Sequence, residues 1–170
     1  MNAEQAQGLL NFFIPTLENE FTTTKKVIAA VPQATCEYKP DAKSKTGREL
    51  AWHIASVEVF FLDGILNGKF EMTGEEPAAP ATLAEISNWY DTNYSDRLNK
   101  LKAISPDKLT QVIPFFGNIQ MPGVAYLQFL VLHSAHHRGQ LSAYLRSMGS
   151  KVPSIYGGSA DEPFEMTAQA

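Results

Sequence analysis

The chain has 170 residues, of which 44% are hydrophobic and 19% charged, and its formal net charge is -4. This composition is typical of a globular domain large enough to bury a core, and we expect residues 1–170 to form one domain. The slightly acidic balance argues against a nucleic-acid partner. No apolar run approaches the roughly 20 residues that a membrane span needs, so we expect no membrane partner either.

The cysteine content and the N-terminal residues indicate a cellular compartment. Cys36 is the single cysteine, which excludes an internal disulfide and fits a reducing environment. Residues 1–5 lack the basic and apolar regions of a signal peptide. The sequence therefore predicts a cytoplasmic protein.

The first predicted helix covers roughly residues 3–30. Its apolar side chains recur at three- and four-residue spacing, as an amphipathic helix requires; they are Leu9, Leu10, Phe13, Leu17, Phe21 and Val27. Pro15 lies inside this segment and cannot donate a backbone hydrogen bond. We therefore expect a kink or a break near Asn11.

Two capping boxes predict where the next helices begin. Thr46 and Glu49 are spaced so that each side chain can bond the other's backbone amide, and the helix that follows should reach about Leu66. Thr82 and Glu85 repeat the pattern and begin a helix that should reach about Ile104. The intervening residues 71–80 are rich in proline and glycine and predict a loop.

A short hairpin and a last helix complete the predicted elements. Residues 112–116 and 119–121 have strand character and flank Gly117-Asn118, a two-residue turn signal. The last helix should run from about Pro122 to Met148, and residues 150–170 should be an irregular tail. The predicted fold is all-α: an antiparallel four-helix bundle with a short β-hairpin before the last helix.

Three of the four histidines occupy positions that favour a shared site. His133 and His137 stand about 40° apart on one helix face, since a helix advances about 100° per residue. Both share the apolar face of the last helix, and His53 shares the apolar face of the second. We therefore expect all three imidazoles to point into the bundle.

A divalent metal ion would explain three inward imidazoles. Each buried ring nitrogen left without a partner costs about 1–3 kcal/mol, and coordination removes that cost. Two ligands at i and i+4 with a third from a facing helix suit Zn²⁺, Ni²⁺ or a similar ion. In the competing interpretation, these histidines are core residues that bond hydroxyl or carbonyl groups.

Five further residues are candidates for supporting or pocket-lining roles. His136 lies at the edge of the same face and could replace one ligand or bond a neighbour. Glu49 could orient His53, although its capping role is the stronger expectation. Tyr126, Gln140 and Tyr144 share the histidine face of the last helix and could line the open side of the site, or simply edge the core.

The sequence resembles the DinB/YfiT-like superfamily over nearly its whole length. The matching motifs are ELAWHIA at residues 49–55, HSAHHRGQL at residues 133–141 and PSIYGGSADE at residues 153–162. The family pattern implies that His53, His133 and His137 are metal ligands and assigns no such role to His136. In that setting we expect Gly139 to allow close helix approach, and Arg138 to pair with a carboxylate or the tail, with Asp161 or Glu162 as candidates.

The resemblance implies a metal-dependent enzyme but does not select its reaction. Superfamily members include transferases that use low-molecular-weight thiols, isomerases and hydrolases. Thiol transfer to a small electrophilic molecule is the first hypothesis, and metal-dependent hydrolysis is its alternative. A non-catalytic stress-response or metal-binding module, with His136 or Glu49 as a fourth ligand, is the third.

Two remaining expectations concern other architectures and partners. A di-iron carboxylate bundle needs Glu-x-x-His motifs, and no Glu stands three residues before His53, His133 or His137. The first helix is apolar over much of its surface, which favours a homodimer that pairs through helix faces.

Overall fold

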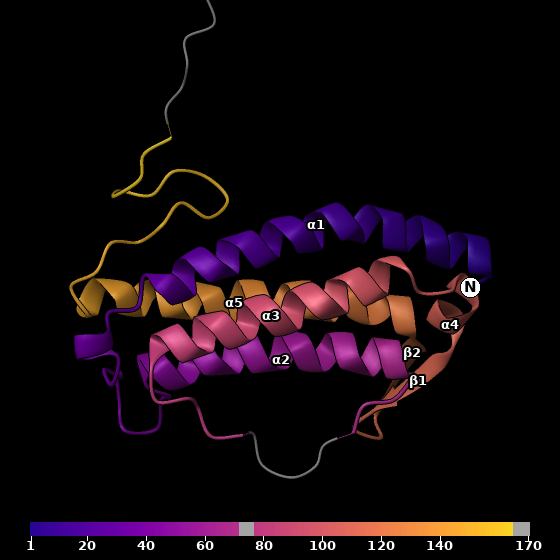
Figure 1. Cartoon of the computed structure of the whole chain (residues 1–170), viewed down its shortest axis with the longest axis horizontal. Helices are drawn as coiled ribbons and strands as arrows, with labels where there is room; N and C mark the ends of the chain where they lie inside the picture. Colours follow the sequence, from indigo (N-terminus) through magenta and orange to yellow (C-terminus); the bar gives the residue numbers. More distant parts are fainter. Residues whose placement is uncertain (72–76, 165–170) are drawn as a thin grey trace, which may run out of the picture.

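The computed structural model describes residues 1–71 and 77–164, and most of this chain is helical (Figure 1). The long helices are α1 (Ala3–Ala29), α2 (Gly47–Asn67), α3 (Leu83–Lys102) and α5 (Tyr126–Ser147). The short elements are α4 (Pro106–Thr110), strands β1 (Val112–Phe115) and β2 (Ile119–Pro122), and 3-10 turns at Gln33–Thr35 and Gly123–Ala125. The predicted helical fold with a hairpin before the last helix is confirmed. Parts of the predicted loop and tail, residues 72–76 and 165–170, lie outside the described residues.

Capping side chains fix where the helices begin. The Thr46 hydroxyl accepts a hydrogen bond from the Glu49 amide, and the Glu49 carboxylate accepts one from the Thr46 amide at 2.8 Å. Thr82 and Glu85 form the same reciprocal pair at the start of α3, so both predicted capping boxes are confirmed. Gly68 ends α2 with a left-handed φ of 72°, a conformation that glycine adopts without steric cost.

Helix α1 continues through Pro15 without a break (Figure 1). The predicted break is wrong, and the helix bows gently instead. Leu10 and Leu17 lie on either side of the proline and are fully buried. Their packing holds both halves of the helix against the bundle, which offsets the hydrogen bond that proline cannot donate.

The hairpin differs from its prediction in the length of its turn. Phe115 pairs with Ile119, so the turn contains three residues, Phe116 to Asn118, instead of Gly117-Asn118 alone. Pro122 pairs with Val112 as the last residue of β2, and a 3-10 turn then leads into α5 at Tyr126. The expected start of the last helix at Pro122 was therefore four residues early.

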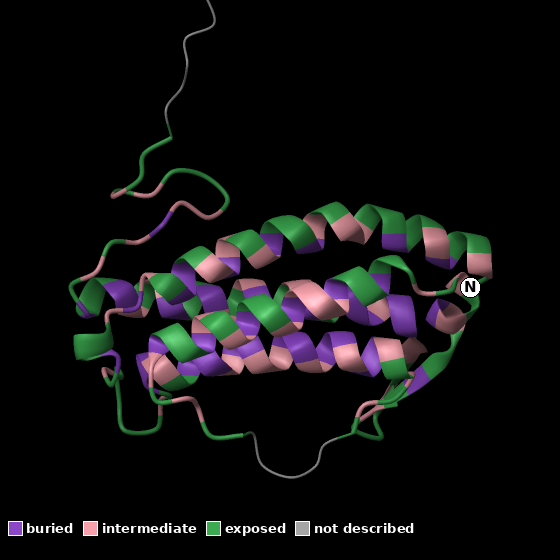
Figure 2. Cartoon of the chain, viewed as in Figure 1, coloured by how far each residue is buried: buried purple, intermediate pink, exposed green. Residues whose placement is uncertain are grey.

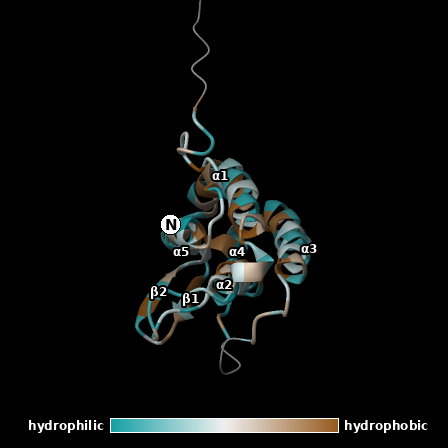
Figure 3. Cartoon of the chain, turned by 90° about the vertical axis from the view of Figure 1, so that its left-hand side faces the viewer, coloured by the Kyte–Doolittle hydropathy of each residue, from teal (hydrophilic) through white to brown (hydrophobic). Residues whose placement is uncertain are grey.

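The order and direction of the helices distinguish this bundle from an up-and-down arrangement. Contacts pair Asp63 with Arg97 and Trp52 with Trp89, so α2 and α3 run parallel. Viewed end-on, α1 lies diagonally across from α2, and α3 across from α5 (Figure 3). Consistent with the parallel course of α2 and α3, Arg48 near the start of α2 donates hydrogen bonds to the carbonyls of Ala79 and Pro80, just before α3 begins.

Helices α1 and α2 both pack against α3 and α5, and α2 lies deeper because its contacts with them are more extensive. Figure 2 shows its surface mostly buried or half-buried, whereas α1 exposes a long outer side. The fully buried stripe of α2 follows helical spacing; it consists of Ala51, Ile54, Ala55, Glu58, Leu62 and Ile65. Among the described residues, no helix is long and apolar enough to cross a membrane.

Candidate metal centre

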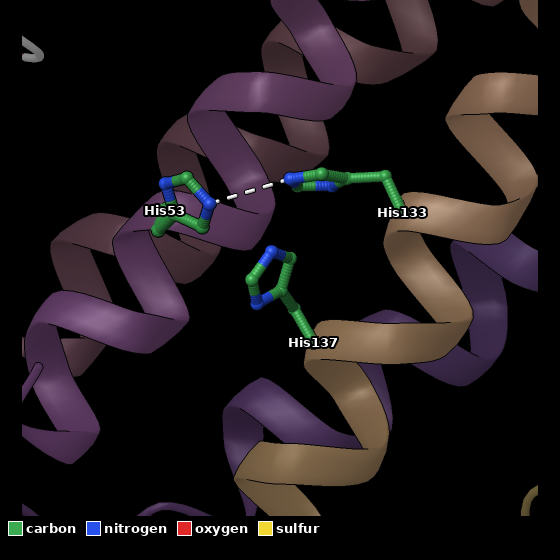
Figure 4. Close-up of side chains that lie close together, drawn as sticks. All are labelled: His53, His133 and His137. Carbon is green, nitrogen blue, oxygen red and sulfur yellow. Dashed lines mark hydrogen bonds between the residues drawn. The ribbon is translucent and has the colours of Figure 1, made fainter. Parts of the chain in front are cut away.

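Three histidine rings converge between α2 and α5 (Figure 4). One ring nitrogen from each of His53, His133 and His137 lies within 4.8 Å of the other two. The Nε2 atoms of His53 and His133 are 3.3 Å apart. Figure 4 shows the three rings turned toward a common space, with His133 and His137 one turn apart on α5.

The antiparallel packing of α2 on α5 brings these residues together. His53 contacts His137, while Phe61, further along α2, contacts His133 earlier on α5. All three histidines are half-buried, so they line the edge of the helix pair and do not fill its core. As expected, the three rings face the partner helix, but they lie at a half-buried position and not in the fully buried core.

The donor set fits a divalent metal ion. Ligand nitrogens at about 2.0–2.1 Å from an ion, placed at tetrahedral angles, are about 3.4 Å apart. The 3.3 Å separation between His53 and His133 is close to this value. Imidazole nitrogen is a common ligand for zinc, nickel, iron and copper, so these three side chains are placed to hold a metal ion.

Gln140 supports the orientation of one histidine. Nδ1 of His137 lies 2.7 Å from Oε1 of Gln140, one turn further along α5. With Nδ1 donating this hydrogen bond, Nε2 keeps its lone pair for a ligand role, as in many metal sites. Burial lowers the pKa of His137 below its ordinary value, which favours the neutral ring that coordinates metals.

The candidates His136 and Glu49 are not members of the three-histidine cluster. His136 is exposed and touches His137 edge-on, with ring centroids 4.7 Å apart. The Glu49 carboxylate bonds the Thr46 amide, and this bond is the main cause of its lowered pKa. Neither residue belongs to the group that could hold a metal ion, which within the described residues contains three side chains.

Tyr126 and Tyr144 also have other roles than the suggested pocket lining. Tyr126 is fully buried, and its hydroxyl donates a 2.6 Å hydrogen bond to the carbonyl of Ile113. It therefore ties the hairpin to α5. Tyr144 packs edge-on against Tyr38, with ring centroids 5.7 Å apart, and neither tyrosine lines the cavity beside the histidines.

A cavity of about 650 Å³ extends from the histidines along α2 toward the hairpin. His53 and His133 line one part of it, and Phe115 and Phe116 line another. Its volume is typical of small-molecule sites, which measure about 300–1,000 Å³. A ligand bound there would meet the ring nitrogens of the histidine cluster directly.

A buried polar cluster, which the sequence analysis missed, lies directly behind the histidines. Arg138 is 1% exposed and forms an ion pair with Glu20. It also donates to the Thr24 hydroxyl at 3.0 Å and to the hydroxyl of Tyr156 in the C-terminal segment. The expected pairing of Arg138 with a carboxylate and with the tail is confirmed in kind, but the partners are Glu20 and Tyr156.

The suggested partners Asp161 and Glu162 have other contacts. Asp161 pairs with Arg146 at 2.5 Å, and Glu162 accepts a hydrogen bond from the Ser154 amide. Gly139 was expected to allow a close helix approach, but a Cβ placed there would meet nothing within 4 Å. Its position faces solvent instead.

Glu58 is the second buried carboxyl group of this cluster. It is fully buried and accepts a hydrogen bond from the Tyr90 hydroxyl, and the Thr24 hydroxyl donates to it at 3.4 Å. Burial raises its pKa to about 7, against the opposing effects of Tyr90, Ser134 and Arg138. The sequence analysis did not single out Glu58. Its spacing from Ala51, Ile54 and Leu62 was the signal that could have revealed it.

These features define a helical-bundle protein with a three-histidine cluster of the kind that binds divalent metals. The chain belongs to the DinB family, whose profile matches residues 12–166. The protein YrdA of Bacillus subtilis (strain 168), which is uncharacterised, is 29% identical over 159 residues, which are 90% of this chain and 91% of YrdA.

Two solved structures have the same fold. A DinB-like protein from Bacillus cereus ATCC 10987 has a TM-score of 0.74 and 26% identity, covering 85% of this chain and 95% of that one. The DinB-like protein YjoA from Bacillus subtilis has a TM-score of 0.69 and 22% identity, covering 84% and 96%. The second likeness concerns the fold alone.

Proposed function

We propose that this protein is a metal-dependent enzyme that holds one divalent ion through His53, His133 and His137. The observation that carries the proposal is the convergence of three ring nitrogens from two helices beside a small-molecule cavity. Membership of the DinB family, with its metal-binding members, supports the same conclusion. Zinc and nickel are among the ions that suit an all-nitrogen donor set.

The proposed reaction transfers a low-molecular-weight thiol to an electrophilic small molecule. A divalent ion bound by neutral imidazoles acts as a Lewis acid that lowers the pKa of a coordinating thiol or water. The thiol sulfur forms a bond to the electrophilic carbon, the leaving group departs with the bonding electron pair, and the thiol proton passes to solvent. Each side chain of the site then returns to its starting state.

The protein's own residues would contribute orientation and exclusion of water. Gln140 fixes the tautomer of His137 and therefore the direction of its Nε2 atom. The aromatic lining of the cavity would limit the water next to the reacting carbon. This lining favours transfer of a thiol to the electrophile over hydrolysis, because hydrolysis needs a water molecule next to the same carbon.

A purely structural metal is the less supported alternative. It would call for a closed set of four ligands. Within the described residues, the group comprises three, and Glu49 is engaged in its capping box. The cavity beside the cluster also suits a substrate better than a sealed structural site.

Metal content is the first test of this proposal. We expect protein purified without an affinity tag to contain, or take up, one equivalent of a divalent ion, and His133→Ala to lose it. His136→Ala is the matched control, because this neighbouring histidine is exposed and lies outside the cluster. Wild-type protein that takes up none of Zn²⁺, Ni²⁺, Fe²⁺ or Mn²⁺ would overturn the proposal.

The reaction class is tested separately on metal-loaded protein. L-cysteine with 1-chloro-2,4-dinitrobenzene reports thiol transfer by the absorbance of the thioether, and 4-nitrophenyl acetate reports hydrolysis. We expect acceleration of the first reaction and its loss in His53→Ala. Acceleration of ester hydrolysis alone would replace the transferase with a hydrolase.

A further inference from the structure

Six aromatic rings surround the cavity beside the histidine cluster. They come from α2, α3 and the hairpin, and they are Trp52, Phe60, Phe61, Trp89, Phe115 and Phe116. Trp52 is fixed by a 2.7 Å hydrogen bond from Nε1 to the carbonyl of Pro77, and it packs edge-on against Trp89. Phe61 packs beside His133, so the aromatic wall continues up to the histidine cluster.

The charged groups of the cavity wall already have partners in the protein. Asp63 lies 3.1 Å from Arg97, and Lys69 lies 2.7 Å from Glu71. These pairs account for each Asp, Glu, Lys and Arg among the described residues that line the cavity. The walls therefore favour a ligand without a net charge, because a charged ligand would compete with these ion pairs.

Phe116 occupies its place at the cavity in an unusual backbone conformation. Its φ is 49°, in the left-handed region that bulky residues rarely adopt, and Gly117 follows with a φ of 72°. Among the described residues other than glycine, Phe116 alone has a positive φ. Its side chain is 58% exposed, so burial does not explain the conformation. Successive positive φ angles are typical of β-hairpin turns, and this turn places Phe116 at the cavity.

We propose that this cavity binds an uncharged aromatic group of the electrophilic substrate, with the reacting carbon directed toward His53 and His133. The proposal names the substrate class for the function proposed above and rests on it. The aromatic body lies between Trp52, Phe60 and Phe116. Flat rings gain most from such walls through stacked and edge-on contacts.

The two tryptophans of the chain provide the measurement, because both line the cavity. The probe is 1,3-dinitrobenzene, which has no leaving group and quenches indole fluorescence. We expect saturable quenching in both metal-loaded and chelator-treated protein. Acrylamide, a quencher without a ring, should give quenching without saturation.

Two variants and one control locate the binding. Phe60→Ala and Phe116→Ala should each weaken binding of the probe by about tenfold, as expected for loss of an aromatic contact and its apolar area. Phe12→Ala is the control, since Phe12 is 70% exposed on α1 and does not line the cavity. Phe116 is exposed, so its variant keeps the test valid if Phe60→Ala does not fold.

The outcomes separate this proposal from the metal proposal. Quenching without saturation, or equal affinity in Phe116→Ala and Phe12→Ala, would overturn the aromatic site whatever the metal content. Saturable, Phe116-dependent quenching in protein that binds no metal would support the aromatic site and reject the metal-dependent reaction. Saturable binding together with metal uptake would support both.

Discussion

Two polar clusters lie back to back on α2 and α5, and they differ in where their partners come from. The first contains His53, His133 and His137, which are half-buried beside a cavity. The second lies one position further round α5, at Ser134 and Arg138, and includes Glu58 of α2. The partners of the second cluster are protein side chains, whereas the first adjoins space for a ligand. We infer that the buried cluster serves stability and the histidine cluster serves chemistry.

The largest expected effect is on the buried cluster. Arg138→Met removes the cation that pairs with Glu20 and should lower the free energy of unfolding by about 3–5 kcal/mol, because a buried carboxylate then lacks its partner. Urea unfolding of chelator-treated protein measures this change in the free energy of unfolding. Arg146→Met is the control, since its ion pair with Asp161 is more exposed and its loss should change stability far less. Equal losses in the two variants would contradict the assignment of stability to Arg138.

The second prediction concerns pH and Glu58. The folded pKa is raised from 4.5 to about 7, so between these values the unfolded state releases a proton that the folded state retains. Stability should therefore fall as pH rises through this window and level off above it. The raised pKa corresponds to roughly 3 kcal/mol, at about 1.4 kcal/mol per unit. Glu58→Gln should remove this dependence. Unfolding curves across the window would then show a difference in free energy of unfolding between wild type and variant that changes with pH.

The third prediction tests the histidine cluster by ligand-induced stability. Zn²⁺ or Ni²⁺ at a hundredfold excess over Kd should stabilise wild-type protein by about 2.7 kcal/mol. His53→Ala should show no such increase, yet in chelator it should unfold close to wild type, because His53 is half-buried. Thermal unfolding with and without the ion distinguishes the two effects. A large loss of stability in metal-free His53→Ala would mean that the histidines are structural.

The smallest expected effect concerns Gln140. Gln140→Leu removes the acceptor for His137 and should weaken metal binding by about 10–100-fold while leaving metal-free stability unchanged. Gln128→Leu, at another exposed glutamine of α5, is the matched control. Competition with a chromogenic chelator measures both affinities, and identical values would show that Gln140 does not support the site.

Most of the fold could be predicted from patterns within one or two helical turns. The Thr46–Glu49 and Thr82–Glu85 spacings specify capping geometry within one turn, so the starts of α2 and α3 could be read from residue types alone. Pro15 could not be interpreted in this way. Whether a proline breaks a helix depends on tertiary packing, here of Leu10 and Leu17, which no local pattern reveals.

The parts of the candidate site that depend on local spacing could be predicted, whereas those that depend on contacts between distant residues could not. The i and i+4 spacing of His133 and His137 brings them together in any helix, and His53, which was predicted to share their site, lies in the same cluster. The burial of Glu58 and the identity of the partners of Arg138 were not predicted, because charged residues are rarely buried unless they are paired. Their partners Glu20 and Thr24 are more than 100 residues from Arg138, and such pairings depend on the helix order. The aromatic cavity likewise needs α2, α3 and the hairpin together.

The parallel course of α2 and α3 has a consequence for how the chain folds. Consecutive long helices do not form antiparallel hairpins, and the Arg138–Glu20 contact closes a separation of 118 residues. Chains dominated by such non-local contacts fold more slowly than bundles built from neighbouring hairpins, because long loops must close before their contacts form. The histidine cluster shares this property, since His53 and His133 are 80 residues apart. A nascent chain therefore completes the three-histidine cluster only after α5 has been synthesised and has docked.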